Sequence, residues 1–104
     1  MGRALAPVRL DLLAHGASEA TRTARFPGDE ALEASAVSAL EVLRGRLRPY
    51  AHMLTAPARA ARETSGALGL NAEVEPWLRD CDYGRWRGLA SQDVAEREPD
   101  AFAA

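Results

Sequence analysis

The sequence predicts an α/β fold, and two observations support this class. Apolar runs with strand character occur at residues 7–14, 50–55 and 72–75, and the stretches between them, 30–47 and 57–68, carry helix signals. A strand followed by a helix and a second strand favours a parallel pair joined by a right-handed crossover. We therefore expect a mostly parallel sheet covered by helices, as part of a three-layer α/β/α sandwich.

The first expected strand, residues 7–14, ends just before His15. An extended run here brings His15 to the carboxyl edge of a parallel sheet, where α/β folds place their ligands. Gly16 then allows a tight turn and a close approach of the backbone to a bound anion. The polar stretch 16–29 shows no periodicity and predicts a long loop, which in compact domains is usually functional or disordered.

The first expected helix covers residues 30–47. Asp29 is expected to cap its N-terminus, and Pro49 is expected to stop it. Apolar residues at three- and four-residue steps predict one buried stripe along this helix: Leu32, Ala36, Leu40, Leu43 and Leu47.

The second half of the chain continues the alternation. The strand at 50–55 leads into a helix that is expected to begin at Pro57 and to end before Gly69. After the strand at 72–75, the aromatic and glycine-rich stretch 77–89 is too irregular for a single element. Its aromatic residues either line a substrate pocket or close the core. Ser91 is expected to cap a last helix, which Pro99 is expected to end.

Length and composition predict one small globular domain, or an incomplete part of one, over residues 1–104. The hydrophobic fraction of 47%, the charged fraction of 27% and the net charge of −2 are ordinary, so neither nucleic acid nor an anionic membrane is indicated as a partner. No apolar run is long enough to cross a bilayer. The single cysteine, Cys81, cannot form an internal disulfide, and the N-terminus lacks a signal-peptide core, so we expect a cytoplasmic protein.

Four segments, in this order, resemble the motifs of the histidine phosphatase superfamily, the phosphoglycerate-mutase-like group. They are Ala14-His15-Gly16, then Gly28-Asp29 with Leu32, then residues 55–65, and then residues 78–88, followed by Pro99 and Phe102. The resemblance implies the first half of a phosphoglycerate-mutase-like domain. It also implies phosphoryl transfer from a small phosphomonoester to a neutral histidine, with no metal or cofactor. Phosphate itself or a small phosphorylated molecule is the implied ligand.

The resemblance identifies His15 with the nucleophile and Asp80 with an acid catalyst, although Asp80 is equally suited to forming a turn. The family's two phosphate-binding arginines fall on Ala14 and Ala60, and one of its glutamates falls on Arg87. We expect the phosphate-binding groups to be Gly16 with three nearby arginines, Arg22, Arg25 and Arg59. Each of these arginines has an alternative as a solvated side chain.

Three functional hypotheses remain open. The first is an impaired family member that binds a small phosphorylated ligand or a partner protein, because losing one charge-stabilising donor typically costs about a hundred- to a thousandfold in rate. The second is an active phosphatase working through a phosphohistidine at His15. The third is a self-associating module or a fragment of a longer protein. Three strands leave open sheet edges, so we expect a homodimer or a partner chain to cover them.

Overall fold

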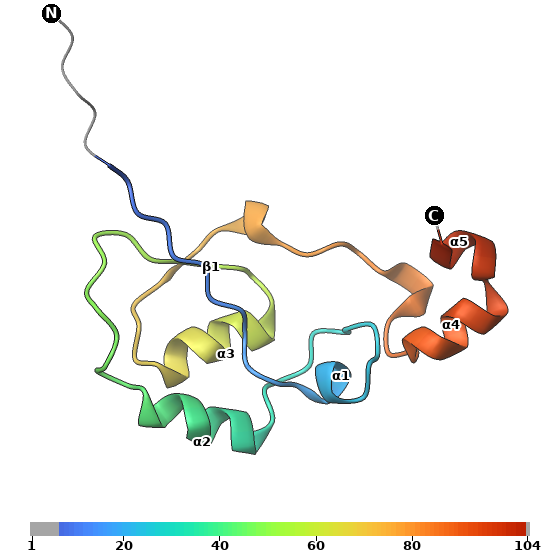
Figure 1. Cartoon of the computed structure of the whole chain (residues 1–104), viewed down its shortest axis with the longest axis horizontal. Helices are drawn as coiled ribbons and strands as arrows, with labels where there is room; N and C mark the ends of the chain where they lie inside the picture. The colour runs from blue at the N-terminus through green and yellow to red at the C-terminus, as the bar shows by residue number, and fades with distance from the viewer. Residues whose placement is uncertain (1–6, 104) are drawn as a thin grey trace, which may run out of the picture.

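The structure, a computed structural model, describes residues 7–103, so residues 1–6 and 104 of the expected domain lie outside the described residues. Figure 1 shows its helices and strands, coloured from the N-terminal to the C-terminal end. They are α1 (Glu19–Arg22), α2 (Ala34–Val42), β1 (Leu54–Thr55), α3 (Arg59–Ala67), β2 (Glu73–Val74), the 3-10 turns η1 (Pro76–Leu78) and η2 (Gly84–Trp86), α4 (Ser91–Arg97) and α5 (Pro99–Ala103).

A small parallel sheet forms the centre of the first part of the molecule. Strand β1 pairs with β2 in parallel, with Leu54 opposite Glu73 and Thr55 opposite Val74. Helix α3 connects the two strands and packs against β1 on one side and α2 on the other. This arrangement confirms the α/β class and the predicted parallel pairing of the strands at 50–55 and 72–75, although both observed strands are shorter.

The expected strand at 7–14 is wrong. Within residues 7–103, the only ladder of paired strands joins β1 to β2, and the segment 7–14 takes no part in it. A strand needs a neighbour for its backbone groups, and no described strand lies alongside this segment. Its apolar side chains are consequently left in solvent, and Val8 is 92% exposed.

The expected helix at 30–47 is shorter than its apolar stripe suggests. Helix α2 begins only at Ala34, because Leu32 forms a bridge with Ser18 and donates its N–H to the Glu63 carboxylate at 2.8 Å. Asp29 does not cap this helix. It adopts a φ of 71°, and its carboxylate accepts the N–H of Arg59 at 2.7 Å, so it satisfies the first turn of α3 instead.

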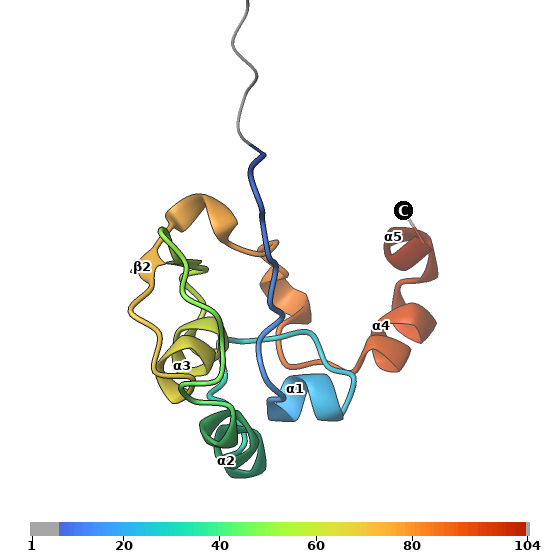
Figure 2. The same ribbon diagram turned by 60° about the vertical axis from the view of Figure 1, so that its left-hand side comes forward.

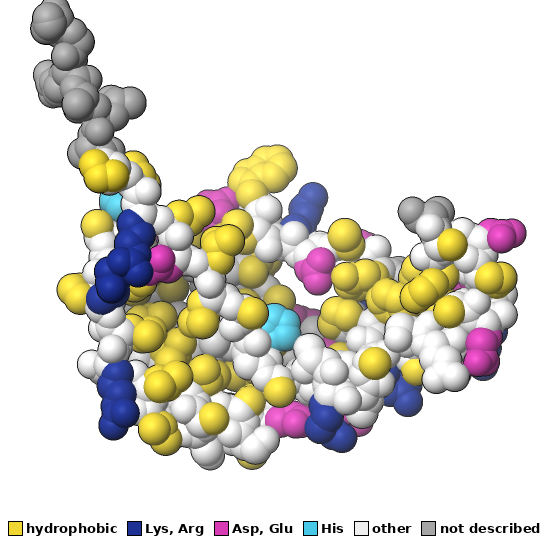
Figure 3. Space-filling model, viewed as in Figure 1, with side chains coloured by type: hydrophobic (Ala, Val, Ile, Leu, Met, Phe, Trp, Pro, Cys, Tyr) yellow, Lys and Arg dark blue, Asp and Glu magenta, His cyan; other side chains and the backbone are white. Residues whose placement is uncertain are grey.

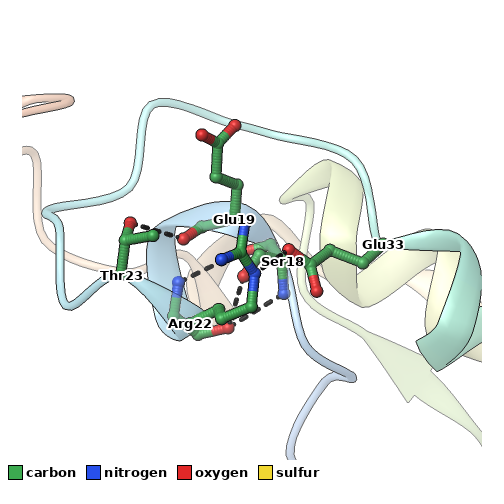
Figure 4. Close-up of polar contacts among 6 residues, drawn as sticks. Ser18, Glu19, Arg22, Thr23 and Glu33 are labelled. Carbon is green, nitrogen blue, oxygen red and sulfur yellow. Dashed lines mark hydrogen bonds and ion pairs between the residues drawn. The ribbon is translucent and has the colours of Figure 1, made fainter.

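The predicted loop 16–29 contains a short helix that the sequence interpretation missed. Ser18 and Thr21 form a capping box at the start of α1: the Ser18 N–H donates to Thr21 Oγ1 at 2.9 Å, and the Thr21 N–H donates to Ser18 Oγ at 3.4 Å. Both Ser18 and Ala20 are buried. Figure 4 shows this turn, with Arg22 directed at Glu33.

The C-terminal part has a core of its own, made of aromatic rings. Phe26 lies 5.0 Å from Tyr83, 5.3 Å from Trp86 and 6.5 Å from Phe102 between ring centroids. The indole N–H of Trp86 donates to Glu98 at 2.8 Å. Trp86 therefore packs in this core, Tyr83 packs against Phe26 and also lines a cleft, and Trp77 is 86% exposed.

Helix α4 begins at Ser91 with Ala90 as its N-cap, so Ser91 is the first helical residue and not the expected cap. The helix ends before Pro99, where α5 begins. Figure 2 shows α4 and α5 on the opposite side of the molecule from α2 and α3. Among residues 7–103, no helix has the length and apolar character needed to cross a membrane.

Candidate active site

A cleft of about 730 Å³ separates the first part of the molecule, with the sheet, α2 and α3, from the second part, with α4 and α5. Small apolar residues around the start of α3 form one wall, including Ala56, Pro57 and Ala60, and the opposite wall comes from residues 78–87. The space-filling view shows the hollow between the two parts (Figure 3). The charged side chains of the lining include Arg25, Asp29, Glu30, Arg79, Asp80 and Arg87, and His15 stands at the same cleft.

Gly16, the residue after His15, fixes the position of the histidine at the cleft. The N–H of Gly16 donates to Thr64 Oγ1 at 2.9 Å, and that hydroxyl donates to the Ala60 carbonyl at 2.7 Å. Because Thr64 is buried in α3, the histidine loop is fixed to this helix. Gly16 therefore directs its N–H at a side chain of the protein, and it is not among the residues that line the cleft.

The His15 ring has one nitrogen engaged by the protein. Nδ1 lies 2.7 Å from the Gly16 carbonyl oxygen. A carbonyl only accepts, so Nδ1 carries the proton, and Nε2 of the neutral ring keeps its lone pair. An exposed imidazole with an unprotonated Nε2 is chemically suited to attack an electrophilic phosphorus.

Asp80 lies at the cleft and also stabilises the local turn. It lines the cleft, and its carboxylate accepts the N–H of Cys81 at 2.7 Å, which fixes the local turn. The Tyr83 hydroxyl lies 3.4 Å away. Partial burial, and then the Asp80 charge, raise the pKa of Tyr83 above its usual value, so this hydroxyl stays protonated and can donate.

The three arginines expected at the phosphate do not come together. Arg25 lines the cleft, and its Nη1 donates to the Gly88 carbonyl at 2.8 Å. Arg22 and Arg59 lie outside the lining. Arg22 pairs with Glu33 at 2.5 Å, which raises the pKa of the guanidinium, and Arg59 pairs with Glu63 at 2.8 Å. Their positive charges are thus largely neutralised by carboxylates of their own chain.

Two further arginines of the lining were missed by the sequence interpretation. Arg79 and Arg87 stand on the wall opposite α3, and Arg87 pairs with Asp82 at 3.1 Å. The Gly84 N–H, and then the Arg87 charge, lower the pKa of the Asp82 carboxyl. For Arg79 no sequence signal indicated a place in the cleft. For Arg87 the signal was its position, because the family resemblance places a glutamate there.

Ala60 and Ala14 mark the places where the resemblance puts phosphate-binding arginines. Ala60 is buried and lines the cleft, whereas Ala14 is exposed. Cys81 is exposed and also lines the cleft. His52 is exposed and stands outside the lining. Within the part of the chain that the structure describes, no three metal-ligating side chains gather into a cluster.

The parallel strand pair and the histidine at the cleft beside it agree with the phosphoglycerate-mutase-like fold that the four motifs imply. The sequence profile of the histidine phosphatase superfamily (branch 1) matches residues 10–104. The chain therefore belongs to the histidine phosphatase superfamily. The family assignment made from the four motifs is confirmed.

Similar proteins are longer than this chain. The "Bifunctional protein Rv2228c" of Mycobacterium tuberculosis is 31% identical over 103 residues, which cover 90% of this chain and 28% of that protein. A solved mycobacterial glucosyl-3-phosphoglycerate phosphatase, complexed with VO3, has a TM-score of 0.66 and 29% identity, covering 84% of this chain and 47% of its own. A phosphoglycerate mutase from Thermus thermophilus has a TM-score of 0.69 and 23% identity, covering 86% of this chain and 53% of its own. The chain thus spans about half of these structures and less than a third of the curated relative.

Proposed function

We propose that this histidine phosphatase family member binds a small phosphorylated molecule at the cleft beside His15 and turns it over slowly or not at all. The observation that carries the proposal is the distribution of arginines. Arg25, Arg79 and Arg87 line the cleft, whereas Ala60 lines it at a position where the family resemblance places an arginine.

Binding is supported by the chemistry of the lining. Guanidinium groups are the side chains best matched to phosphate oxygens, because their planar N–H groups can bind two oxygens at once. The small apolar wall at the start of α3 offers room for the organic part of a ligand. The solved mycobacterial relative at 29% identity is a glucosyl-3-phosphoglycerate phosphatase, which favours a phosphomonoester as the ligand class here.

Slow turnover is supported by the loss of fixed positive charge. The two nearby arginines expected to replace the missing pair, Arg22 and Arg59, are held by Glu33 and Glu63. Each missing donor to the transferring phosphoryl group is expected to cost about a hundred- to a thousandfold in rate, with incomplete additivity. Two such losses would place turnover far below the ordinary range of about 1–1000 per second.

Any turnover that remains would follow a balanced two-step course. The Nε2 lone pair of His15 attacks phosphorus, the bond from phosphorus to the ester oxygen breaks, and Asp80 in its acid form gives the leaving oxygen a proton. Water then attacks the phosphohistidine, the P–N bond breaks, and the Asp80 carboxylate takes the water proton. Phosphate leaves, and His15 returns to its neutral form.

The test combines a rate with a binding measurement on the purified protein. Hydrolysis of an aryl phosphate is compared in wild type, His15→Ala and the matched control His52→Ala, and inorganic phosphate is titrated into each by calorimetry. We expect phosphate binding that His15→Ala and Arg25→Ala both weaken several-fold and that His52→Ala leaves unchanged. Turnover in the ordinary enzyme range that His15→Ala abolishes would instead establish the active-phosphatase alternative.

A restoration experiment examines the arginine argument directly. The double variant Ala14→Arg with Ala60→Arg returns guanidinium groups to the two positions that the family resemblance indicates. We expect phosphate to bind at least about tenfold more tightly, because each added guanidinium group can bind two phosphate oxygens at once. Unchanged binding with a preserved circular dichroism spectrum would show that the anion does not bind at this place.

A further inference from the structure

Arg87 is a basic side chain at a cleft position where the family resemblance places an acidic one. It lines the cleft on the wall opposite α3, and its side chain is 59% exposed. A Cβ atom added at Gly28 would lie 4.0 Å from the Arg87 Cβ. Arg87 is therefore part of the cleft wall, next to the segment 28–30, which lines the same cleft.

One carboxylate holds the Arg87 side chain from outside the cleft. Asp82 is not among the lining residues, and its Oδ1 accepts an N–H of Arg87 Nη2 at 3.1 Å and the Gly84 N–H at 2.9 Å. The bond from Gly84 fixes this carboxylate to the backbone of η2, and the carboxylate in turn fixes the guanidinium. A guanidinium has five N–H donors. Among the described residues only Asp82 is bonded to that of Arg87, so the remaining donors are free to bind a group in the cleft.

The carboxylates that line the cleft beside Arg87 are already bonded to backbone N–H groups. Both oxygens of Glu30 accept the Gly28 N–H, at 2.9 and 3.0 Å. The Asp29 carboxylate accepts the Arg59 N–H at 2.7 Å. Arg87 therefore supplies the side-chain hydrogen-bond donors in this corner of the cleft.

The chemistry of a guanidinium limits what can bind beside it. A guanidinium only donates hydrogen bonds, whereas a carboxylate only accepts them. A ligand group that meets Arg87 must therefore accept, and an anionic acceptor forms the stronger, charge-assisted bond. An ammonium group carries only donors and is repelled by the like charge. A glutamate at position 87, close to the Glu30 carboxylate, would have the opposite preference.

His15 and Arg87 stand on opposite walls of this cleft. His15 is fixed to α3 through the bond from Gly16 to Thr64, and Arg87 belongs to the stretch 78–87 that forms the other wall. A phosphomonoester with its phosphorus at His15 and its organic part extended across the cleft brings the end of that part to Arg87.

We propose that Arg87 determines specificity at this end of the ligand. It makes the cleft prefer phosphomonoesters whose organic part carries a second anionic group, and it disfavours those whose organic part carries a cationic group. The inference rests on the proposed binding of a phosphorylated molecule beside His15, and it adds the charge of the organic part to that proposal.

Three phosphomonoesters of similar size test this preference on the purified protein by calorimetry. Phosphoglycolate carries a carboxylate, propyl phosphate carries no charge beyond its phosphate, and phosphoethanolamine carries an ammonium group. We expect wild type to bind phosphoglycolate about fivefold more tightly than propyl phosphate, the upper range for a partly exposed ion pair, and to bind phosphoethanolamine most weakly. If a probe is turned over, kcat/KM replaces the dissociation constant in the same comparison.

Two substitutions at position 87 and one control assign the preference to this side chain. Arg87→Glu is expected to reverse the order of the three esters, and Arg87→Gln, which has no charge, is expected to bring their affinities within about twofold of one another. Arg46→Glu makes the same charge change at an exposed arginine outside the cleft lining, and it is expected to keep the wild-type order. Circular dichroism checks that each variant is folded.

The outcomes separate this inference from the proposed function. A wild type that binds all three esters equally, or an Arg87→Gln variant that keeps the wild-type order, would overturn the inference and leave the proposed function in place, because the esters still bind. Loss of the order in Arg46→Glu would show that the net charge of the chain, and not Arg87, sets the preference. A wild type that binds neither inorganic phosphate nor any of the esters would overturn both.

Discussion

The two parts of the molecule on either side of the cleft are stabilised in different ways. The first part is held by backbone pairing and helix packing, since β1 pairs with β2 and α3 packs on β1 and α2. The second part, around α4 and α5, contains no strand pair among the described residues and depends on the aromatic rings grouped around Phe26. The catalytic candidates come from both parts, so the cleft depends on two unlike cores.

The segment 16–33, which includes α1, contacts both cores. On one side Gly16 donates its N–H to Thr64, and Leu32 donates its N–H to Glu63. On the other side the Phe26 N–H donates to the Leu89 carbonyl at 2.9 Å, and Gly88 donates back to Phe26 at 2.8 Å. His15 directly precedes this segment and is positioned by α3. Arg25, ten residues later, is positioned by the aromatic part.

The largest effect is expected from removing an aromatic ring of the second part. Trp86→Ala eliminates contacts with Phe26 and Phe102 and the hydrogen bond to Glu98. We expect a loss of about 2–3 kcal/mol, somewhat below the roughly 3–5 kcal/mol of a fully buried tryptophan, because Trp86 is only partly buried. Urea unfolding followed by circular dichroism measures this change.

The matched control is Trp77→Ala, which removes the same side chain at an 86% exposed position. We expect its stability to stay within about 0.5 kcal/mol of wild type. Equal losses in the two variants would show that the aromatic rings do not form the core of the second part.

A smaller effect is expected from the bond that ties the histidine loop to the first part. Thr64→Val keeps the shape of the side chain but leaves the Gly16 N–H without its acceptor, at an expected cost of about 1–2 kcal/mol. Phosphate binding should weaken as well, because Gly16 adjoins His15. Thr23→Val is the control: both hydroxyls donate to the carbonyl four residues earlier, and only that of Thr64 also accepts an N–H from another element. Identical effects of the two variants would contradict the positioning role of Thr64.

Local sequence signals predicted the elements whose causes are local. Gly69, with a φ of 71°, follows the end of α3 as expected, and Pro99 separates α4 from α5. Proline and left-handed glycine act on their own backbone, so a single position is informative. The parallel pairing of β1 with β2 was also predictable, because a helix connects them.

Two of the errors concern partners that lie far apart in the sequence. Asp29 has the residue type and position of a cap for the helix that follows it, yet it caps α3, thirty residues further on. Arg22 and Arg59 have the position of phosphate ligands, but they pair with the carboxylates of Glu33 and Glu63 instead. The contacts of Asp29 and Arg22 are not visible in local spacing, because each joins two separate elements of the fold. Arg59 and Glu63, in contrast, form an i,i+4 pair within α3, which local spacing could have indicated. The candidate site was therefore predicted at His15, Asp80 and Arg25, and missed at Arg79 and Arg87.

The smallest effect is expected from the carboxylate that joins α3 to the segment before α2. The Leu32 N–H, and then the Arg59 guanidinium at 2.8 Å, lower the pKa of Glu63 below its ordinary value of 4.5. A carboxyl with a lowered pKa in the folded state stabilises the protein above its ordinary pKa, and this contribution disappears as the pH falls through the folded value. Glu63→Gln should thus lower stability at neutral pH by less than the other two variants do, and the difference from wild type should vanish as the pH falls below 4.5. Asp82 and Glu98 also have lowered pKa values, so the difference between the two unfolding curves, and not either curve alone, isolates Glu63.

Glu41→Gln is the control, because Glu41 is an exposed glutamate of α2 without a side-chain partner among the described residues. This variant should give no difference from wild type at any pH. A Glu63→Gln difference that is constant from neutral to acidic pH would show that the carboxylate charge does not hold α3 to this segment.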